Sequence, residues 1–501
     1  MPLWQSIPLA SILLPLAGAA LASVLPARAA RRWTVLLLCL VTGGSCLLLV
    51  RTLPGSTAFN YPMGHFGAPW GNELRAGPLE AMMALLFSGI SLLSLLGGMR
   101  RLQEDITSHR QSAFCAILLL MQAALMAQVY TNDLFTVYVF VEIMTIAGCA
   151  LIASRSTRGR GLASAARYMV MNLIASALLL LGIILTYDLT GHLLMEPVQK
   201  AILPLQQSGA YALPLTAVIA LPVLALAIKA ALFPFHTWVP DAYASATPTG
   251  AAMLSGVVCK GYLVVLLKVI FRVITPAVVL DAGISDVLFC FGAAGMVMGS
   301  VHALRQTEVK RMIAWSSVAQ IGYIFLGLGL HTEAGAAAAL LHLMGHAAAK
   351  SLLFLSVDPL MAASGRQGRL EGLRGAGLRA PVAGAAFTLG ALSLVGIPFL
   401  PGFVSKVSLA RAALAYGGLH TWGALAVLAL STLLNVLYML RTVLLIWSPG
   451  GSPRDPAVPS PGPLCHLSLG LLSAACLGLG CLAGPVLEAI RAGLAVFGIP
   501  L

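Results

Sequence analysis

Residues 226–262 read LAIKAALFPFHTWVPDAYASATPTGAAMLSGVVCKGY, a largely apolar stretch that contains two lysines, Lys229 and Lys260. Its apolar runs are typical of helices that cross a membrane. The three prolines between the lysines favour interruption of those helices, because proline lacks a backbone N–H and clashes with the preceding turn. An ammonium group at the centre of a bilayer costs roughly 2.5 to more than 10 kcal/mol, so each of these lysines is a candidate functional residue.

The whole chain shares this apolar character. Of its 501 residues, 59% are hydrophobic and only 9% are charged, and its mean hydropathy is +0.92. A helix needs about 20 apolar residues to cross a hydrocarbon core of about 30 Å. We therefore predict an all-α polytopic membrane protein with about fourteen transmembrane helices and no amphipathic helix after the last one. The predicted spans are 7–25, 34–51, 79–98, 112–130, 133–153, 168–187, 213–233, 248–271, 283–303, 312–331, 335–357, 382–404, 419–446 and 465–486.

Basic residues are distributed unequally between the loops on the two sides of these spans. Nineteen fall in one set of alternate loops, including Arg158, Arg160 and Arg454, and seven fall in the other set with the termini, including Lys268 and Arg272. The positive-inside rule places the first set in the cytoplasm. We expect a multi-pass protein of the cytoplasmic (inner) membrane with both termini on the outer side. The same asymmetry accounts for the net charge of +13, so no nucleic-acid partner is expected.

Two predicted spans carry the prolines of a broken helix. Span 7 is followed by Pro234 and Pro240, and span 12 contains Pro398 and Pro401. Interrupted helices in corresponding positions of two halves are typical of transporters built from inverted repeats. We predict two inverted five-helix repeats, spans 4–8 and 9–13, with breaks in helices 7 and 12. The chain then divides into residues 1–111 (helices 1–3), 112–275 (first repeat), 276–447 (second repeat) and 448–501 (proline-rich linker and last helix).

Seven ionisable residues within the spans or at their edges stand out as candidates. They are Glu142, Lys229, Lys260, His342, His346, Lys350 and Lys406. An apolar surrounding disfavours the charge of a lysine, and a nearby carboxylate favours it again. A Glu142–Lys229 pair that opens and closes would therefore control the proton affinity of the lysine. His342, His346 and Lys350 are spaced four residues apart and share one face of a helix. Together these residues predict a proton relay.

Simpler explanations exist for several of them. Glu142 and Lys229 could form a purely structural ion pair, and Lys406 could reach the membrane surface from a helix end. The histidines could be packing residues. The segment HLMGH (342–346) has the spacing of the zinc motif HExxH but lacks its glutamate and a third ligand. The nine cysteines are scattered without a CxxC pair, so we expect neither a metal nor a cofactor in this chain.

Five segments resemble the antiporter-like membrane subunits shared by respiratory complex I, Mrp cation/proton antiporters and membrane-bound energy-converting hydrogenases. They are NDLFTVYVFVEIM (132–144), KAALFPFHTWVPDAYASATPTGAAMLSGVVCKGY (229–262), VKRMIAWSSVAQIGYIFLGL (309–328), HLMGHAAAKSLLFL (342–355) and GIPFLPGFVSK (396–406). The resemblance covers roughly residues 60–445 and implies fourteen helices with two inverted five-helix repeats. By its motifs it also implies a hydrated proton pathway with Glu142 and Lys229 as the gate pair, Lys260 as the bridging lysine, His342 and His346 as the histidine stretch and Lys406 as the terminal group.

The sequence departs from the family pattern in places. Gly345 precedes His346 where the family often has asparagine, and the aspartate often found ahead of the third helix is replaced near Gly77. Lys406 argues against the complex I subunit that has glutamate at this position. The absence of a lateral helix after residue 490 argues against the longest, distal subunit. The first motif favours the D-type subunit of Mrp antiporters.

We therefore expect a proton-translocating subunit of a multisubunit complex, coupled to cation exchange or to redox chemistry in partner subunits. The expected partners are other membrane subunits, including homologous antiporter-like subunits, within the lipid bilayer. The residues leave open whether Na⁺ is moved as well as protons, and which of the three parent complexes contains the chain. A stand-alone secondary transporter of a small solute is the alternative. An integral-membrane enzyme built around HLMGH is a third, weaker hypothesis.

Overall fold

The computed structural model describes residues 2–66, 71–155, 159–209, 211–274, 276–366, 368–450 and 461–497. At His65, Gly159, Arg160, Pro276 and Ala277 only the backbone is described. Two of the basic residues that predict the orientation, Arg158 and Arg454, lie outside the described residues, as does most of the proline-rich segment 448–463.

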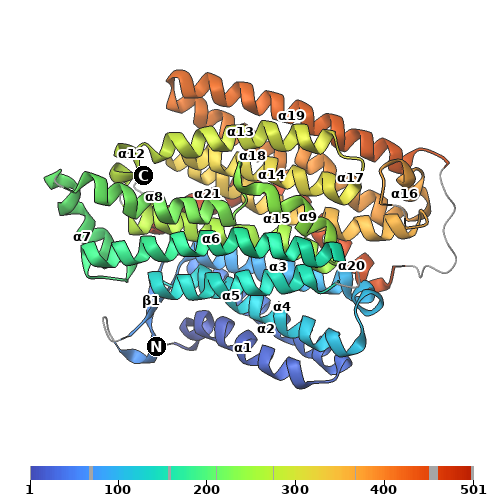
Figure 1. Cartoon of the computed structure of the whole chain (residues 1–501), viewed down its shortest axis with the longest axis horizontal. Helices are drawn as coiled ribbons and strands as arrows, with labels where there is room; N and C mark the ends of the chain where they lie inside the picture. Colours follow the sequence, from blue (N-terminus) through green and yellow to red (C-terminus); the bar gives the residue numbers. More distant parts are fainter. Residues whose placement is uncertain are drawn as a thin grey trace.

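Long apolar helices, laid side by side, form nearly the whole molecule (Figure 1). The helices of the first half, long and short together, are α1 (Ile7–Val24), α2 (Ala27–Thr52), α3 (Pro78–Asp105), α4 (Ser108–Tyr130), α5 (Leu134–Ala153), α6 (Gly159–Thr190), α7 (Met195–Ser208) and α8 (Ala212–Lys229). In the second half they are α9 (Val239–Ser245), α10 (Pro248–Met253), α11 (Cys259–Lys268), α12 (Pro276–Asp281), α13 (Ile284–Leu304), α14 (Val309–Gly329), α15 (Glu333–Ala362), α16 (Ala376–Arg379), α17 (Pro381–Val395), α18 (Pro401–Tyr416), α19 (Gly418–Trp447), α20 (Pro463–Cys481) and α21 (Ala483–Phe497). Among the described residues, 13 helices are long and apolar enough to cross a membrane, and a bent pair around α16 and α17 raises the number to 14. The predicted all-α polytopic fold is confirmed.

Two helices are broken where the prolines predict it. α8 ends at Lys229, and the chain passes through Ala231, at φ 67°, before a 3-10 turn (η3, Phe235–Trp238) leads into α9. Between α17 and α18, Gly396 and Phe399 have φ values of 94° and 69°. A positive φ does not continue a right-handed helix, so both breaks are abrupt. Each break leaves the last carbonyls of the preceding helix without an intrahelical partner.

The helices that carry most of the predicted ionisable residues are the most deeply buried. The continuous segment Pro248–Val273 consists of α10, the π-helical turn η4 (Leu254–Val258), α11 and the π-helical turn η5 (Val269–Val273). In its most apolar stretch, 100% of the residues are buried inside the molecule. The share is also 100% in α15, and it is 94% in α14. The corresponding values for the outer helices α1, α2, α19 and α20 are only 33–39%. The large apolar surface that these outer helices expose is suited to lipid.

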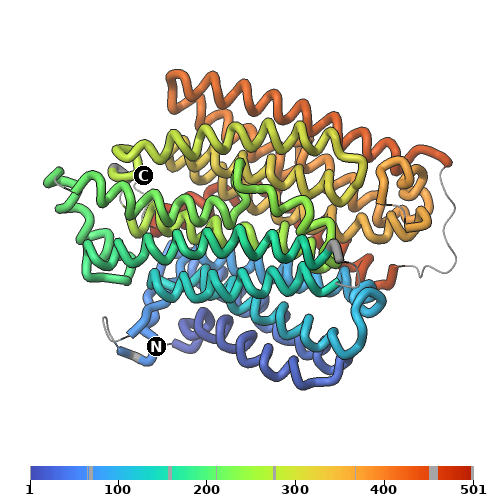
Figure 2. The backbone as a smooth tube through the Cα atoms, in the orientation of Figure 1, coloured from blue at the N-terminus to red at the C-terminus, as the bar shows by residue number. Residues whose placement is uncertain are grey.

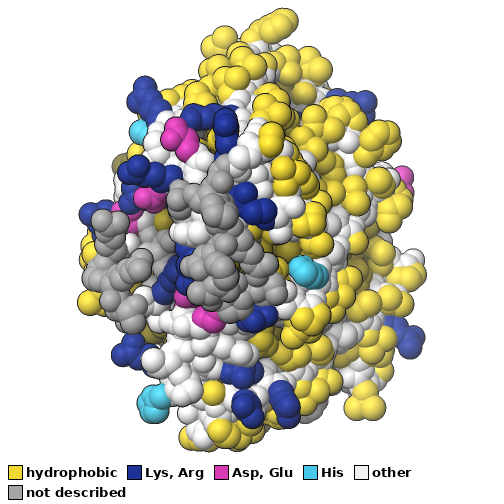
Figure 3. Space-filling model, turned by 90° about the vertical axis from the view of Figure 1, so that its right-hand side faces the viewer, with side chains coloured by type: hydrophobic (Ala, Val, Ile, Leu, Met, Phe, Trp, Pro, Cys, Tyr) yellow, Lys and Arg dark blue, Asp and Glu magenta, His cyan; other side chains and the backbone are white. Residues whose placement is uncertain are grey.

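The described chain begins and ends at the same end of the bundle, together with α7 and α12 (Figure 1, Figure 2). This is the arrangement that an even number of crossings produces. The opposite end, which includes α16, faces the viewer in Figure 3, where Lys and Arg side chains gather while the flank is mostly hydrophobic. The arginine-rich loops and the chain ends therefore lie at opposite ends of the molecule.

Several short elements lie outside the predicted spans. β1 (Phe59–Pro62) pairs antiparallel with β2 (Glu73–Ala76). α7 is a short amphipathic helix, and α21 follows the last span with Ile490 and Leu494 buried and Arg491 exposed. The expectation of no amphipathic helix after the last span is therefore wrong. The apolar residues of α21 recur every three to four positions, which gives the helix one buried face.

The assignment of Lys268 and Arg272 to a loop is also wrong. Both lie in the continuous helical segment that ends at Val273, and their exposed fractions are 0% and 5%. Without these two, the outer set of basic residues falls from seven to five, so the charge asymmetry between the two ends persists.

Candidate functional site

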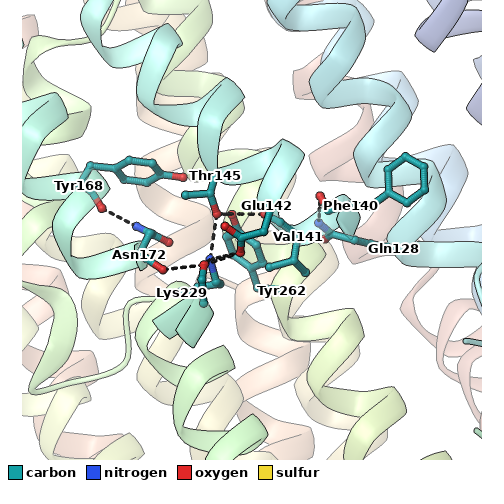
Figure 4. A network of polar contacts seen from close by, with 10 residues as sticks. Gln128, Phe140, Val141, Glu142, Thr145, Tyr168, Asn172, Lys229 and Tyr262 are labelled. Carbon is teal, nitrogen blue, oxygen red and sulfur yellow. Dashed lines mark hydrogen bonds and ion pairs between the residues drawn. The ribbon is translucent and has the colours of Figure 1, made fainter. Parts of the chain in front are cut away.

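Glu142 and Lys229 come together from α5 and α8 (Figure 4). The start of α5 is fixed by Asp133, whose side chain accepts a hydrogen bond from the backbone N–H of Thr136 at 2.7 Å. Glu142 follows nine residues later, midway along the helix. Lys229 is the last residue of α8, directly before the break. Its side chain has no exposed surface, whereas that of Glu142 is 23% exposed.

A serine hydroxyl connects the two charged groups. The Nζ of Lys229 lies 3.6 Å from Oε1 of Glu142, beyond hydrogen-bond distance. The ammonium group instead donates to Oγ1 of Thr145 and Oγ of Ser176, each at 2.8 Å. The Ser176 hydroxyl in turn donates to the Glu142 carboxylate. Two hydroxyl groups thus solvate the buried ammonium group directly. One of them, that of Ser176, links it to the carboxylate through a second hydrogen bond.

The same lysine faces a tyrosine of the neighbouring helix α11. Its Nζ lies 5.5 Å from the centre of the Tyr262 ring, within the range of a cation–π contact. The Tyr262 hydroxyl is 3.4 Å from Oγ1 of Thr145. The first cluster therefore joins α5, α6, α8 and α11 through polar side chains.

Lys260 lies two residues before Tyr262 and is completely buried. Its ammonium group donates to the carbonyl of Ser255, which belongs to the π-helical turn η4. The Ser255 hydroxyl lies 3.1 Å from that of Ser317 in α14. π-Helical turns of this kind occur frequently at functional sites.

Lys350 is held by α14. Its Nζ donates to the carbonyl of Ile313 at 2.7 Å and to Oγ of Ser316 at 2.5 Å. Lys260 and Lys350 are close enough for their charges to interact, and Lys260 also acts electrostatically on His342 and His346. These four residues therefore share one electrostatic environment at the centre of the molecule.

The two histidines lead toward the second helix break. The rings of His342 and His346 are stacked with centroids 6.2 Å apart. Nδ1 of His342 lies 2.9 Å from Oγ of Ser405, the residue before Lys406. Among the described residues, neither ring nitrogen of His346 has a hydrogen-bond partner. Because buried polar groups are usually hydrogen-bonded, this unpaired imidazole is a candidate functional group.

Lys406 binds backbone carbonyl groups that the second helix break leaves without an intrahelical partner. Its Nζ donates to the carbonyls of Leu394 and Val395, both at 2.9 Å, and lies 5.1 Å from the centre of the Tyr323 ring. The ring of His342 also stacks on Tyr323, with centroids 5.0 Å apart. The structure thus brings His342 and Lys406 to one aromatic side chain.

The seven predicted residues fall into two clusters, each held together by hydroxyl or aromatic side chains, and a middle section. Glu142 and Lys229 form the first cluster, and His342, His346 and Lys406 form the second. In the part of the chain that the structure describes, no hydrogen bond links Lys260 or Lys350 to either cluster; Lys260 is bonded to the Ser255 carbonyl, and Lys350 to Ile313 and Ser316.

Sequence reasoning missed a further buried lysine, Lys268. Lys268 donates to the carbonyls of Gln128, Val129 and Thr131, at 2.9, 2.5 and 2.8 Å, at the end of α4. One turn later, Arg272 lies 3.9 Å from the buried Glu80. The signal was the spacing, since Lys268 follows Lys260 by eight residues in one apolar run. Ser176, Tyr323 and Ser405 carry no such signal, because hydroxyl and aromatic residues are common in membrane helices.

Comparison with known proteins gives a consistent result. Residues 131–433 match the family described as NADH:quinone oxidoreductase/Mrp antiporter, TM. NADH-quinone oxidoreductase subunit N of Desulforudis audaxviator is 34% identical over 403 residues, which cover 80% of this chain and 78% of that protein. The D-type subunit of the Na⁺/H⁺ antiporter of Alkalihalophilus pseudofirmus is 31% identical over 353 residues, which cover 70% of this chain and 69% of that protein.

Solved structures share the whole fold. A chain of the Mrp complex from Dietzia sp. DQ12-45-1b superposes with a TM-score of 0.85 at 25% identity, and the match covers 99% of this chain and 97% of that one. A chain of the membrane-bound sulfane sulfur reductase, an archaeal respiratory membrane complex, also superposes with a TM-score of 0.85, at 26% identity and 99% and 98% coverage.

Proposed function

The chain belongs to the NADH:quinone oxidoreductase/Mrp antiporter transmembrane family, and we propose that it moves protons across the cytoplasmic membrane as one subunit of a multisubunit complex. The observation that carries this proposal is the Glu142–Lys229 pair. A fully buried ammonium group lies 3.6 Å from a carboxylate and is joined to it through the Ser176 hydroxyl. A charge at this depth is costly, and a purely structural pair would gain little from it.

The pair is a gate in this proposal. When Glu142 and Lys229 are close, the carboxylate favours the charged lysine, and when they separate, the apolar surroundings favour proton release. Lys229 stands at the end of α8, directly before the break, so a small shift of this helix end would change the distance between the two groups. The hydroxyls of Thr145 and Ser176 hold the ammonium group 3.6 Å from the carboxylate, so a small movement would change its environment.

The remaining residues form the relay. Lys260 and Lys350 receive the proton at the centre, His346 and His342 pass it along α15, and Lys406 is the terminal group at the second break. The support for this order is the stacked histidine pair and the Ser405 hydroxyl, 2.9 Å from His342. Water at the unpaired nitrogens of His346 would complete the path.

The proposal includes partners and orientation. Relatives and structural neighbours are subunits of complexes, so the partners are other membrane subunits, including homologous antiporter-like subunits, that supply cation exchange or redox chemistry. Residues 112–275 and 276–447 act as the two repeats. The arginine-rich end faces the cytoplasm and both termini face outward. A membrane-impermeant thiol reagent should label Gln207→Cys, in α7, in intact cells, in a background without native cysteines; labelling of Gln103→Cys, in α3, instead would reverse this orientation.

The direct test is proton transport by the purified complex in proteoliposomes, driven by an imposed membrane potential and followed with an internal pH dye. Glu142→Gln removes the carboxylate charge that stabilises the ammonium group, so we expect transport to fall at least tenfold while the complex still assembles on native gels. The matched control is Glu196→Gln, which makes the same change in α7, where Glu196 is partly exposed and, among the described residues, forms one ion pair, with Lys200. Normal transport by Glu142→Gln would refute the gate.

A further inference from the structure

A large polar cavity opens at the arginine-rich end of the bundle. Its volume is about 770 Å³, and it lies between the end of α3, the start of α6, α9, the start of α14 and the end of α15. Figure 3 views this end of the molecule, where basic and acidic side chains gather. The relay described above does not use this cavity.

The acidic residues of the cavity are already paired with arginines. Asp105 contacts Arg101 and Arg155 at 3.2 Å each, and Asp358 contacts Arg101 at 3.4 Å. Asp241, in α9, contacts Arg167 at 2.7 Å and Arg311 at 2.5 Å. Glu308 contacts Arg311 at 3.7 Å. Two basic residues that line the cavity take no part in these pairs. They are Arg366, at the rim, and Lys310.

Lys310 differs from the other basic residues of the cavity. It is only 8% exposed, yet it lines the cavity. Among the described residues it has no hydrogen bond and no ion pair within 4 Å, while Asp358 and Asp105 act on it only over a longer range. A buried ammonium group without a partner is unfavourable, so water in the cavity must solvate it or its proton must leave.

The helix that carries Lys310 also holds Lys350. Lys310 is the second residue of α14, and the carbonyl of Ile313, one turn further along, accepts a hydrogen bond from Nζ of Lys350. Ser316, on the same helix, accepts the second bond. Three residues of helix correspond to roughly 4.5 Å of axial rise, so this helix joins the cavity wall to the buried relay.

We propose that Lys310 is the residue that takes up protons from the cavity and delivers them through water to Lys350. This inference rests on the proposed function, because it supplies the entry point of that relay. The neutral amine of Lys310 takes a proton from cavity water, and its ammonium form then passes one proton toward the neutral amine of Lys350. Lysine suits this role because it exchanges its proton, whereas arginine stays charged.

The test compares four variants of the whole complex in proteoliposomes, with proton uptake from the side of the arginine-rich end as the readout. Lys310→Arg keeps the charge but not the exchangeable proton, and Lys310→Gln removes both, so we expect each to lower uptake at least tenfold. Lys310→His restores an exchangeable proton and should recover part of the rate. Arg366→Gln is the control, since it removes one positive charge from the cavity rim and should leave uptake unchanged.

The outcomes separate this inference from the proposed function. Full uptake by Lys310→Arg would show that a positive charge at this position suffices, and would overturn the inference in favour of a structural or anion-binding role. In that case Glu142→Gln still loses transport, and the proposed function stands. If Glu142→Gln is also normal, the proposed function fails with it. If Lys310→Gln does not assemble on native gels, the comparison of Lys310→Arg with Lys310→His decides the question.

Discussion

Ser176 is the side chain on which the first cluster depends. Its hydroxyl accepts a hydrogen bond from Lys229 and donates to Glu142, and the carbonyl of Asn172 lies 2.8 Å away as a second acceptor. A hydroxyl has one proton and two lone pairs, so it can serve only one of these acceptors at a time. Rotation of the hydroxyl toward Asn172 would leave Glu142 free to approach Lys229 directly. Ser176 therefore links the protonation state of the lysine to the position of the carboxylate.

Replacing this hydroxyl should slow proton transport without dismantling the site. In Ser176→Ala the Glu142 carboxylate and the Lys229 ammonium group each lose one hydrogen bond, at a cost of about 1.5–3 kcal/mol for bonds to charged groups. If half the cost of one such bond appears in the barrier, coupled transport falls by about four- to twelvefold. Initial rates of proton uptake in proteoliposomes measure the effect. Ser176→Thr retains the hydroxyl and should stay near the original rate; equal rates for Ala and Thr would remove Ser176 from the pathway.

The seven ionisable candidates could be chosen from sequence because charge is rare and costly in apolar segments. Six of them are at most 9% exposed, and Glu142 has 23% of its side chain exposed. The groups that contact them could not be chosen. Ser405 meets His342 only because the break brings α18 against α15, and Tyr323 reaches Lys406 from a different helix. Such contacts depend on tertiary packing, which no residue spacing within one helix encodes.

At the scale of elements, the sequence predicts the helix breaks but not the contacts that the freed carbonyl groups make. A proline removes a donor and fixes φ, so both interruptions follow from local chemistry. The fate of the freed carbonyls depends on the other half of the span. At the second break, the carbonyls of Leu394 and Val395 accept hydrogen bonds from Lys406, so the lysine of α18 is held by the end of α17. The break is thereby converted into a binding site for an ammonium group.

Close contact between α17 and α18, the two parts of the second broken span, depends on Gly402. A Cβ atom at this position would lie 1.7 Å from the carbonyl oxygen of Ser393, which is backbone and cannot move aside alone. Gly402→Ala should therefore displace α18 from α17, detach Lys406 from its carbonyls, and lower both the thermal stability and the proton transport of the complex. Its control is Gly423→Ala in α19, where the nearest atom is 4.0 Å away. Alanine there should be tolerated, because it favours a helix by about 1 kcal/mol over glycine.

Thermal unfolding in detergent and proton uptake in proteoliposomes would measure both glycine variants. Unchanged stability and transport in Gly402→Ala would mean that α17 and α18 can separate without consequence, contrary to the role assigned to the second break.

The elements that sequence reasoning missed share one property. The β1–β2 pair, α7 and α21 are short or amphipathic, and none contains the long apolar run that identifies a span. α21 nevertheless completes a buried cluster, because Arg75 donates to the carbonyl of Val496 at 2.6 Å and Arg272 lies 5.4 Å from the Phe497 ring. An element of this kind is stabilised by the surface it covers, which is visible only in the folded chain.

At the scale of the whole molecule, polarity runs along two directions. The outer helices expose leucines at the surface of the molecule. The central helices α11, α14 and α15 carry six buried lysine and histidine side chains, those of Lys260, Lys268, Lys310, His342, His346 and Lys350. Along the bundle axis, the arginine-rich cavity lies at one end and the chain ends lie at the other. A protein that moves protons needs both features, since the apolar surface prevents leakage and the polar interior provides a path.

The central claim is that Lys229 gives up and regains a proton under the control of Glu142. The measurement that tests it most directly is potential-driven proton uptake by the whole complex with Lys229→Arg in proteoliposomes. Arginine keeps the positive charge and the ion pair but stays protonated, so the account predicts an assembled complex whose uptake is at least tenfold lower. Uptake at the original rate would show that the pair needs only a charge at position 229, and would contradict the account.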